Sequence, residues 1–282
     1  MPPQMHGSPV ASIAVGKKIG VAPSASLTYF AVPMWDRDNS PYIEALKKIF
    51  CLNQTIPETE KIRVISISTG MFEFQSHYEE WKKALEQAEG LGILVVTCDQ
   101  AVLKYGTLDL SPGLNPDDVR SYKAGKYAGK DDQLRVPAGG RALASHRGDE
   151  VYTFYREGGV SWAAPYIAGL AALAFQTNPE ITPSLIIRCL VDTAAETEAG
   201  PVVNPIGFIE KIKETKNKKM QKRPFGLCGS QSLLEQNIEK FGPAGFQALF
   251  PARLHLVKQT RQRFPRVITT MPDLVGPPGH SE

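Results

Sequence analysis

Ser161 lies where a nucleophilic side chain would be held at the start of a helix. Gly158 and Gly159 precede it, and the residues from there to Leu173 are mostly small and apolar. A serine hydroxyl becomes a good nucleophile when a base, usually histidine, removes its proton. A helix N-terminus also directs backbone N–H groups and the positive end of the helix dipole at developing negative charge. The stretch therefore indicates acyl-transfer chemistry at Ser161.

Ser161 also has a purely structural interpretation. Serine is a preferred N-cap residue, and helices rich in alanine and glycine pack closely without doing chemistry. The segment alone does not distinguish capping from catalysis, so residues elsewhere in the chain have to decide.

A histidine near the start of the chain supplies a candidate base. His6 begins H-G-S-P-V-A-S-I-A-V-G, which is followed by I-G-V-A-P-S-A-S-L and, much later, by G-V-S-W-A-A-P-Y-I-A-G around Ser161. Together these stretches resemble the motifs of the subtilisin-like serine proteases (the subtilases, peptidase family S8). The motifs occur in that family's order, and 155 positions separate His6 from Ser161, against about 157 in subtilisin. The resemblance covers roughly residues 5–210.

The resemblance implies that His6 is the general base and Ser161 the nucleophile. The family's third catalytic residue is an aspartate in a D-[ST]-G motif, about 32 residues before the histidine in subtilisin. Here five residues precede His6, none of them acidic, and D-[ST]-G occurs nowhere in the chain. We therefore predict a partial catalytic domain without the segment that carries this aspartate, either as a fragment or as a naturally shortened form.

The resemblance also implies a peptide-binding edge. Ser68, Thr69 and Gly70 match the strand end whose backbone pairs with an extended substrate in the family. Gly159 lets the turn before Ser161 and a substrate chain approach each other closely. Recognition of a peptide would then occur by strand addition.

The oxyanion-binding residue departs from the family pattern. Where the family has A-A-G-N, this chain has T-C-D-Q, from Thr97 to Gln100. Gln100 is a candidate donor through its side-chain amide. An ionised Asp99 would repel an oxyanion, and its alternative interpretation is the polar end of a buried strand.

Alternating strand and helix patterns position these residues. Such alternation predicts an α/β fold of three layers, with a mostly parallel sheet flanked by helices, incomplete at the N-terminus. The expected helices cover 6–16, 41–50, 77–92, 181–194 and 203–212, besides the one that begins near Ser161. The expected strands lie within 20–35, 61–70, 92–99, 134–145 and 151–155. Residues 101–133 are polar and rich in glycine and proline, which predicts a long loop or insertion.

Charge divides the chain into two parts. Residues 211–282 hold 13 Lys and Arg against 5 Asp and Glu, whereas residues 1–210 hold 19 against 24. We predict a peptidase domain at 1–212 and a basic, poorly ordered extension at 213–282. We expect this extension to be solvated and to bind no nucleic acid; its basic segments 216–223 and 261–266 leave nucleic acid or an acidic membrane as the alternative.

Composition narrows the other possibilities. The hydrophobic content of 42% is typical of a globular domain, and no apolar run reaches the roughly 18 residues that span a bilayer. Four scattered cysteines show neither paired nor metal-ligand spacing. We expect no cofactor, no metal and no membrane association, and the lack of a signal peptide favours a cytoplasmic location.

The sequence thus predicts a serine endopeptidase that acts on peptide or protein substrates through an acyl-enzyme on Ser161. Because the aspartate is missing, we expect weak activity or none from this chain. The alternative is an inactive, protease-like module that binds peptides or proteins without cutting them. Oligomeric state and cleavage preference do not follow from the sequence.

Overall fold

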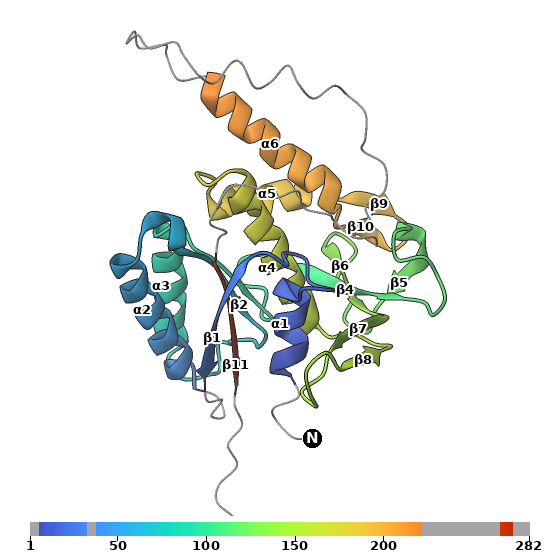
Figure 1. The fold of residues 1–282 in the computed structure, drawn as a ribbon, viewed down its shortest axis with the longest axis horizontal. Helices are drawn as coiled ribbons and strands as arrows, with labels where there is room; N and C mark the ends of the chain where they lie inside the picture. Colours follow the sequence, from blue (N-terminus) through green and yellow to red (C-terminus); the bar gives the residue numbers. More distant parts are fainter. Residues whose placement is uncertain (1–5, 33–37, 222–265, 273–282) are drawn as a thin grey trace, which may run out of the picture.

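A computed structural model describes residues 6–32, 38–221 and 266–272, without side-chain detail in 218–221 and 266–272. Helices and strands alternate along most of the chain (Figure 1). The helices are α1 (Gly7–Val15), α2 (Ser40–Thr55), α3 (Tyr78–Gly90), α4 (Val160–Thr177), α5 (Pro183–Asp192) and α6 (Pro205–Gln221). The strands are β1 (Ser26–Val32), β2 (Ile62–Ile67), β3 (Leu94–Thr97), β4 (Tyr105–Leu110), β5 (Tyr122–Ala124), β6 (Leu134–Gly139), β7 (Arg141–Ala144), β8 (Tyr152–Tyr155), β9 (Ala195–Thr197), β10 (Gly200–Val202) and β11 (Arg266–Pro272).

The strands form three sheets. The first has the order β1-β11-β2-β3 and is parallel throughout. The second has the order β5-β4-β6-β10-β9, with parallel pairing at its centre and antiparallel strands at both edges. A hairpin of β7 and β8 makes the third. The fold is therefore the mostly parallel α/β architecture that the sequence predicted.

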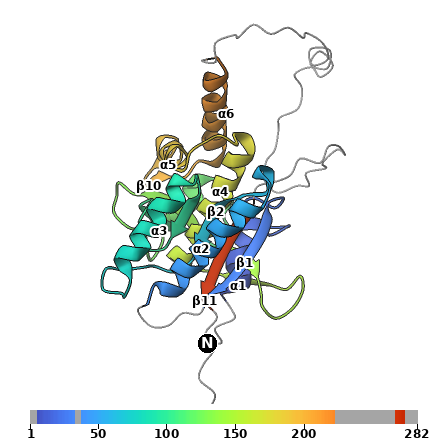
Figure 2. The same ribbon diagram turned by 90° about the vertical axis from the view of Figure 1, so that its left-hand side faces the viewer.

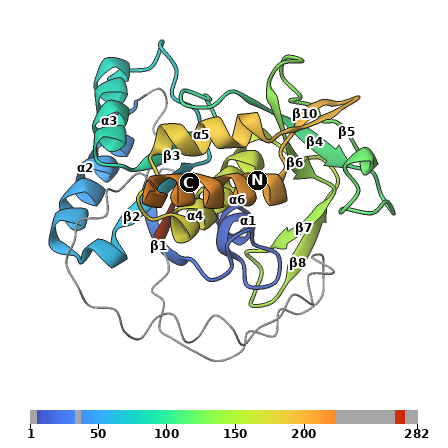
Figure 3. The ribbon, with the colours of Figure 1, turned by 90° about the horizontal axis from the view of Figure 1, so that it is seen from above.

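Alternation of side chains along β2 and β3 separates two hydrophobic cores. Val64 and Leu94 lie in the core with α4, α5 and α6, whereas Ile65 and Val95 lie in the core with α2 and α3. Since successive residues of a strand point to opposite faces, a strand covered on both sides has to be apolar throughout. The views of Figure 1 and Figure 3 show the resulting layers, with α2 and α3 on one side of the first sheet and α1 and α4 on the other.

The last strand comes from the segment that the sequence assigned to a poorly ordered extension. Figure 2 shows β11 between β1 and β2, parallel to both. Residues 266–272 thus fill a central position of the first sheet, and α6 continues to Gln221, past the predicted domain boundary at 212. These two stretches therefore have regular structure within the predicted extension, through continuation of a helix and main-chain pairing to two neighbouring strands, and the order of the extension as a whole stays a prediction. Residues 222–265, including the basic cluster from 261, lie outside the described residues.

The prediction of a loop at 101–133 is wrong in part. It contains β4 and β5, and β4 pairs with β6 in parallel. The polar residues and glycines of this stretch indicated a loop, but β4 is almost completely buried. The remaining predicted elements occur close to their expected positions, with β1 more exposed than a buried strand because it lies at the sheet edge.

Two further properties concern the described part of the chain. Cys51, Cys98 and Cys189 are free thiols. None of the described helices is long and apolar enough to cross a bilayer.

The central position of β11 makes a prediction about stability. Proline in the interior of a sheet removes a ladder hydrogen bond and is rarely tolerated, whereas the first residue of a strand accepts it. Ile268→Pro should therefore lower the free energy of unfolding by about 1–3 kcal/mol, because a ladder carbonyl loses its donor, measured by urea unfolding of the full chain. Arg266→Pro, at the first strand position, is the matched control and should cost much less. Equal stability of the Ile268→Pro variant and the unmodified protein would contradict the central strand.

Candidate active site

Ser161 lies in the first turn of α4, but it is not the cap. The helix begins at Val160, and the N-cap is Gly159, which provides no side-chain hydrogen bond. Ser161 is the second helical residue, so its hydroxyl is free to point away from the helix backbone. The capping interpretation of this serine is therefore wrong. Its backbone N–H belongs to the first turn, where N–H groups have no acceptor one turn back in the helix.

The structure brings His6 and Ser161 together. The Nε2 atom of His6 lies 3.0 Å from the Oγ atom of Ser161, across 155 positions of sequence. This distance is within the range that a general base needs to take the hydroxyl proton. The pair is partly buried, which limits competition from water.

Close packing of α1 against α4 sets this distance. His6 is the N-cap of α1 and Ser161 lies in the first turn of α4. At Gly169, α4 approaches both the end of α1 and the segment that follows it: an added Cβ would lie 3.2 Å from the backbone oxygen of Ala14 in α1 and 2.6 Å from the Cβ of Val21 beyond it. The lack of a side chain at Gly169 therefore allows the two helix starts to meet.

A proline inside α4 leaves the backbone oxygen of Ser161 available for a hydrogen bond from outside the helix. Pro165 has no N–H, so it cannot bond the carbonyl four residues back, which is that of Ser161. The Oγ atom of Ser68 donates to this carbonyl at 2.8 Å. Ser68 follows β2 directly, so the end of the central strand holds the backbone of the nucleophile.

Burial sets the protonation of His6. Loss of solvent lowers the pKa of this imidazole below its ordinary value of 6.5, because the charged form is disfavoured. The neutral form is the one that accepts a proton from serine. Among the described residues, none provides a carboxylate to the other ring nitrogen of His6, so nothing described there orients the ring as the aspartate of a complete triad does.

The predicted peptide-binding edge lies beside this pair. The backbone oxygen of Thr69 accepts a hydrogen bond from the N–H of Cys98 at 3.0 Å, which continues the pairing of β2 with β3. A Cβ at Gly70 would lie 2.7 Å from the ring of Phe72 and 3.2 Å from the backbone nitrogen of Asp99, so a side chain here would displace the ring. A Cβ at Gly159 would lie 3.4 Å from the Oγ atom of Ser161. Glycine at this position therefore keeps the approach to the hydroxyl open.

The two oxyanion candidates bond to backbone groups near the ends of β2 and β3 and at the start of β4. The carboxylate of Asp99 accepts the backbone N–H of Met71 at 3.0 Å and of Ala101 at 3.1 Å, besides the hydroxyl of Thr97. Asp99 is thus the polar end of a strand, as its alternative interpretation has it. Gln100 has a left-handed backbone, with φ of 59°, and its Oε1 atom accepts the N–H of Tyr105 at 3.4 Å. Its side-chain NH₂ keeps its donor capacity, so its oxyanion role stays a prediction.

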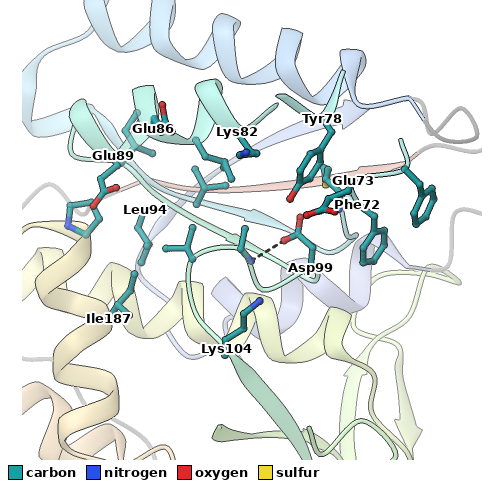
Figure 4. Close-up of a pocket in the computed structure, with 18 residues that line it drawn as sticks. Phe72, Glu73, Tyr78, Lys82, Glu86, Glu89, Leu94, Asp99, Lys104 and Ile187 are labelled. Carbon is teal, nitrogen blue, oxygen red and sulfur yellow. Dashed lines mark hydrogen bonds between the residues drawn. The ribbon is translucent and has the colours of Figure 1, made fainter. Parts of the chain in front are cut away.

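A cavity of about 680 Å³ opens at the far end of the peptide-binding edge. Figure 4 shows Asp99, Phe72, Glu73 and Tyr78 at one end of it, and Glu89, Leu94 and Ile187 toward the other. The side chains of Phe72 and Phe74 stack on each other and are 47% and 70% exposed. His6 and Ser161 do not line this cavity, so it is separate from the pair.

Other residues around the site have ordinary structural surroundings. Trp162 is 8% exposed and packs edge-to-face on Tyr155, so it belongs to the core. His77 and His146 are exposed. In the part of the chain that the structure describes, no cluster of three or more His, Cys, Asp or Glu side chains is arranged to hold a metal ion.

Sequence reasoning missed three residues that shape the site. Pro165 and Gly169 were noted only as parts of a motif, and Asp109 fell within the predicted loop. The alternation of Y-G-T-L-D-L (residues 105–110) was the available signal for the strand that carries Asp109.

Comparisons with known proteins agree with this geometry. Residues 2–99 match the family model Peptidase_S8, the subtilase family. The fold is similar to that of the subtilase cytotoxin SubAB assembly, at 16% identity over 77% of this chain and 79% of that chain, with a TM-score of 0.58. It is also similar to the A-subunit of the AB5 toxin from E. coli (17% identity, 74% and 79% covered, TM-score 0.55) and to a cold adapted subtilisin-like serine proteinase (21% identity, 71% and 72% covered, TM-score 0.51).

The chain therefore has a subtilisin-like fold, and its resemblance to the subtilase family is confirmed. The family match includes His6 and ends before Ser161. The assignment of the serine rests on its motif and on its position beside His6.

The close approach of α1 and α4 predicts a strong effect at Gly169. Gly169→Ala forces the helices apart, and overpacking of this kind costs about 1–3 kcal/mol of unfolding free energy. Urea unfolding measures the loss, and a fluorophosphonate probe that reacts with activated serines should label Ser161 more slowly. The matched control is Gly90→Ala, where an added Cβ meets nothing within 4 Å. If both variants behave alike, the helix contact does not set the site.

Burial of His6 predicts two pH effects. Labelling of Ser161 needs the neutral imidazole, so its rate should fall only below the ordinary histidine value of 6.5. The unfolded chain takes up a proton near pH 6.5 while the folded chain does not. Stability from this group is therefore complete above pH 6.5 and is lost as the pH falls from there to the lower, folded pKa.

The comparison of the unmodified protein with His6→Gln isolates this contribution, and His146→Gln is the control for an exposed histidine. A labelling midpoint above 6.5 would contradict the effect of burial on His6.

Proposed function

We propose that this chain is a serine endopeptidase domain that cleaves peptide or protein substrates with Ser161 as nucleophile and His6 as general base. The observation that carries the proposal is the 3.0 Å distance between the His6 Nε2 atom and the Ser161 Oγ atom. The match to the subtilase family over residues 2–99 supports it.

The proposed reaction begins with attack of the Ser161 hydroxyl on a peptide carbonyl. His6 accepts the hydroxyl proton and passes it to the leaving amine, which gives an acyl-enzyme. Water then attacks the ester, again with His6 as base, and Ser161 is regenerated. The negative charge on the carbonyl oxygen develops near the N-terminus of α4, where the Ser161 N–H and the helix dipole favour it. Gln100 is the proposed second donor.

Among the described residues, none places a carboxylate next to His6, and this determines the turnover rate that we expect. Without that partner the imidazole is free to rotate, and the imidazolium formed during attack is not stabilised. Comparable defects lower kcat by about 10⁴. We therefore expect slow turnover from the 282-residue chain.

A peptide-binding module without catalysis is the second candidate. The same missing carboxylate favours it, together with the cavity lined by Met71, Phe72 and Glu73 just beyond Gly70. Such a module would bind an extended peptide at Ser68–Gly70 but leave it intact. The retained contact between His6 and Ser161 favours the enzyme, because binding alone does not need it.

Covalent labelling distinguishes the two functions. A fluorophosphonate probe should label the protein slowly, with the label on Ser161 identified by peptide mass spectrometry. Ser161→Ala should abolish labelling, and His6→Ala should slow it by about 10²-fold or more, the usual contribution of a general base. His146→Ala is the control and should label like the unmodified protein.

Labelling that does not depend on His6, or none at all, would contradict the enzyme. In that case, binding of fluorescein-labelled unfolded casein that leaves the casein intact would support the binding module.

A further inference from the structure

A buried carboxylate lies beneath the loop that leads to Ser161. Asp109 is the fifth residue of β4 and is 7% exposed. Its Oδ1 atom accepts the backbone N–H of Gly158 at 3.1 Å, and the backbone N–H of Gly139 also donates to this carboxylate. The bond to Gly158 joins residues 49 positions apart, and Gly158 lies three residues before the nucleophile.

Two glycines make this contact possible. A Cβ at Gly139 would collide with the Oδ1 atom of Asp109 and lie 2.6 Å from the nitrogen of Gly158. A Cβ at Gly158 would lie 2.5 Å from the backbone oxygen of Ala138. The end of β6 and the loop before α4 are therefore packed without side chains around a single carboxylate.

Burying a carboxylate costs free energy unless hydrogen bonds compensate for the lost water. Burial raises the pKa of Asp109 and nearby Glu157 adds to the effect, whereas the N–H groups of Gly158 and Gly139 and the charge of Lys123 lower it. The two N–H groups are thus the hydrogen bonds that compensate for the burial of Asp109. Gly139 is the last residue of β6, and Gly158 lies in the loop that leads into α4. The position of this loop relative to β6 determines where α4 begins.

No side chain of the N-cap residue caps the N-terminus of α4. Gly159 gives no side-chain hydrogen bond, so the loop from Gly158 to Ser161 is fixed by contacts from other elements. Ser68 holds the backbone oxygen of Ser161 from the end of β2. Asp109 holds the N–H of Gly158 from β4. The two contacts restrain a backbone oxygen and a backbone N–H of the same short loop.

We propose that Asp109 is a positioning residue for the nucleophile, which fixes the loop at Gly158 so that the Ser161 hydroxyl stays within reach of His6. Asp109 touches neither the substrate nor the reacting atoms. The inference rests on the proposed role of Ser161, and it predicts an effect on the loop that can be measured without catalysis.

The test compares three variants of the full chain, each normalised to its folded fraction. Asp109→Ala removes both hydrogen bonds. Asp109→Asn keeps an oxygen for Gly158 but presents an amide N–H₂ group in place of the second oxygen. Thr107→Val is the matched control, because Thr107 is also fully buried on β4 and its Oγ1 atom accepts the N–H of Tyr127, away from the Ser161 loop.

Labelling kinetics with a fluorophosphonate probe provide the first readout. Asp109→Ala should lower the maximal labelling rate at saturating probe by about 10²-fold, as misplacement by about 1 Å does, while the probe concentration at half-maximal rate stays unchanged. Asp109→Asn should recover most of the rate. Thr107→Val should lose stability but label at the normal rate per folded molecule. A purely structural Asp109 would instead give Asp109→Ala the normal rate, and that result would overturn the proposal.

Hydrogen exchange provides the second readout, which is independent of catalysis. Peptides that span residues 155–162 should exchange faster in Asp109→Ala than in Thr107→Val. If the unmodified protein is not labelled at all, the proposed function fails, and exchange in this segment still decides whether Asp109 positions the loop. Unchanged exchange would overturn the inference.

A further variant covers the case in which Asp109→Ala does not fold. Gly139→Ala inserts a methyl group against the Asp109 carboxylate and leaves the carboxylate in the chain. It should slow labelling and speed exchange in residues 155–162, and Asp109→Asn should change both in the same direction but less. Normal labelling and exchange in both of these variants would overturn the proposal.

Discussion

The structure of this site depends on how closely α1 can pack against α4. Gly169 brings the backbone of α4 against Ala14 and Val21, with no room for a methyl group between them. Both helices are largely buried along this contact, which holds their N-terminal ends near each other. His6 and Ser161 meet there at 3.0 Å.

Besides the helix packing, two hydrogen bonds from other elements fix the backbone around Ser161. Pro165 leaves the carbonyl of Ser161 without its helical partner, and the hydroxyl of Ser68 occupies it. Asp109 restrains the other end of the same loop at Gly158. Each of these anchoring hydrogen bonds comes from a strand end, β2 in one case and β4 in the other, so the first and second sheets together define the backbone around Ser161. A buried unsatisfied polar group costs about 1–3 kcal/mol, which opposes loss of either anchor.

The first sheet is continuous because β11, from the C-terminal part of the sequence, lies between β1 and β2. β11 bonds to β1 on one side and to β2 on the other, so the strand that precedes Ser68 has a partner on both edges. Without β11, the main-chain groups of β1 and β2 that now pair with it would need other partners. The position of Ser68, and through it the backbone of Ser161, therefore depends on residues more than 190 positions away in the sequence.

The sequence by itself determined the family resemblance and the order of most elements. Its motifs predicted His6 as the base and Ser161 as the nucleophile, and its local patterns located α1, α3 and α5, because both signals are local. Tertiary structure decided the rest. It showed that Ser161 is not a cap, that Asp99 bonds backbone groups at the ends of two strands, that residues 105–110 form a buried strand, and that residues 266–272 enter the sheet centre. The last two depend on pairing between distant segments, where burial and backbone hydrogen bonding outweigh the local preference of the residues.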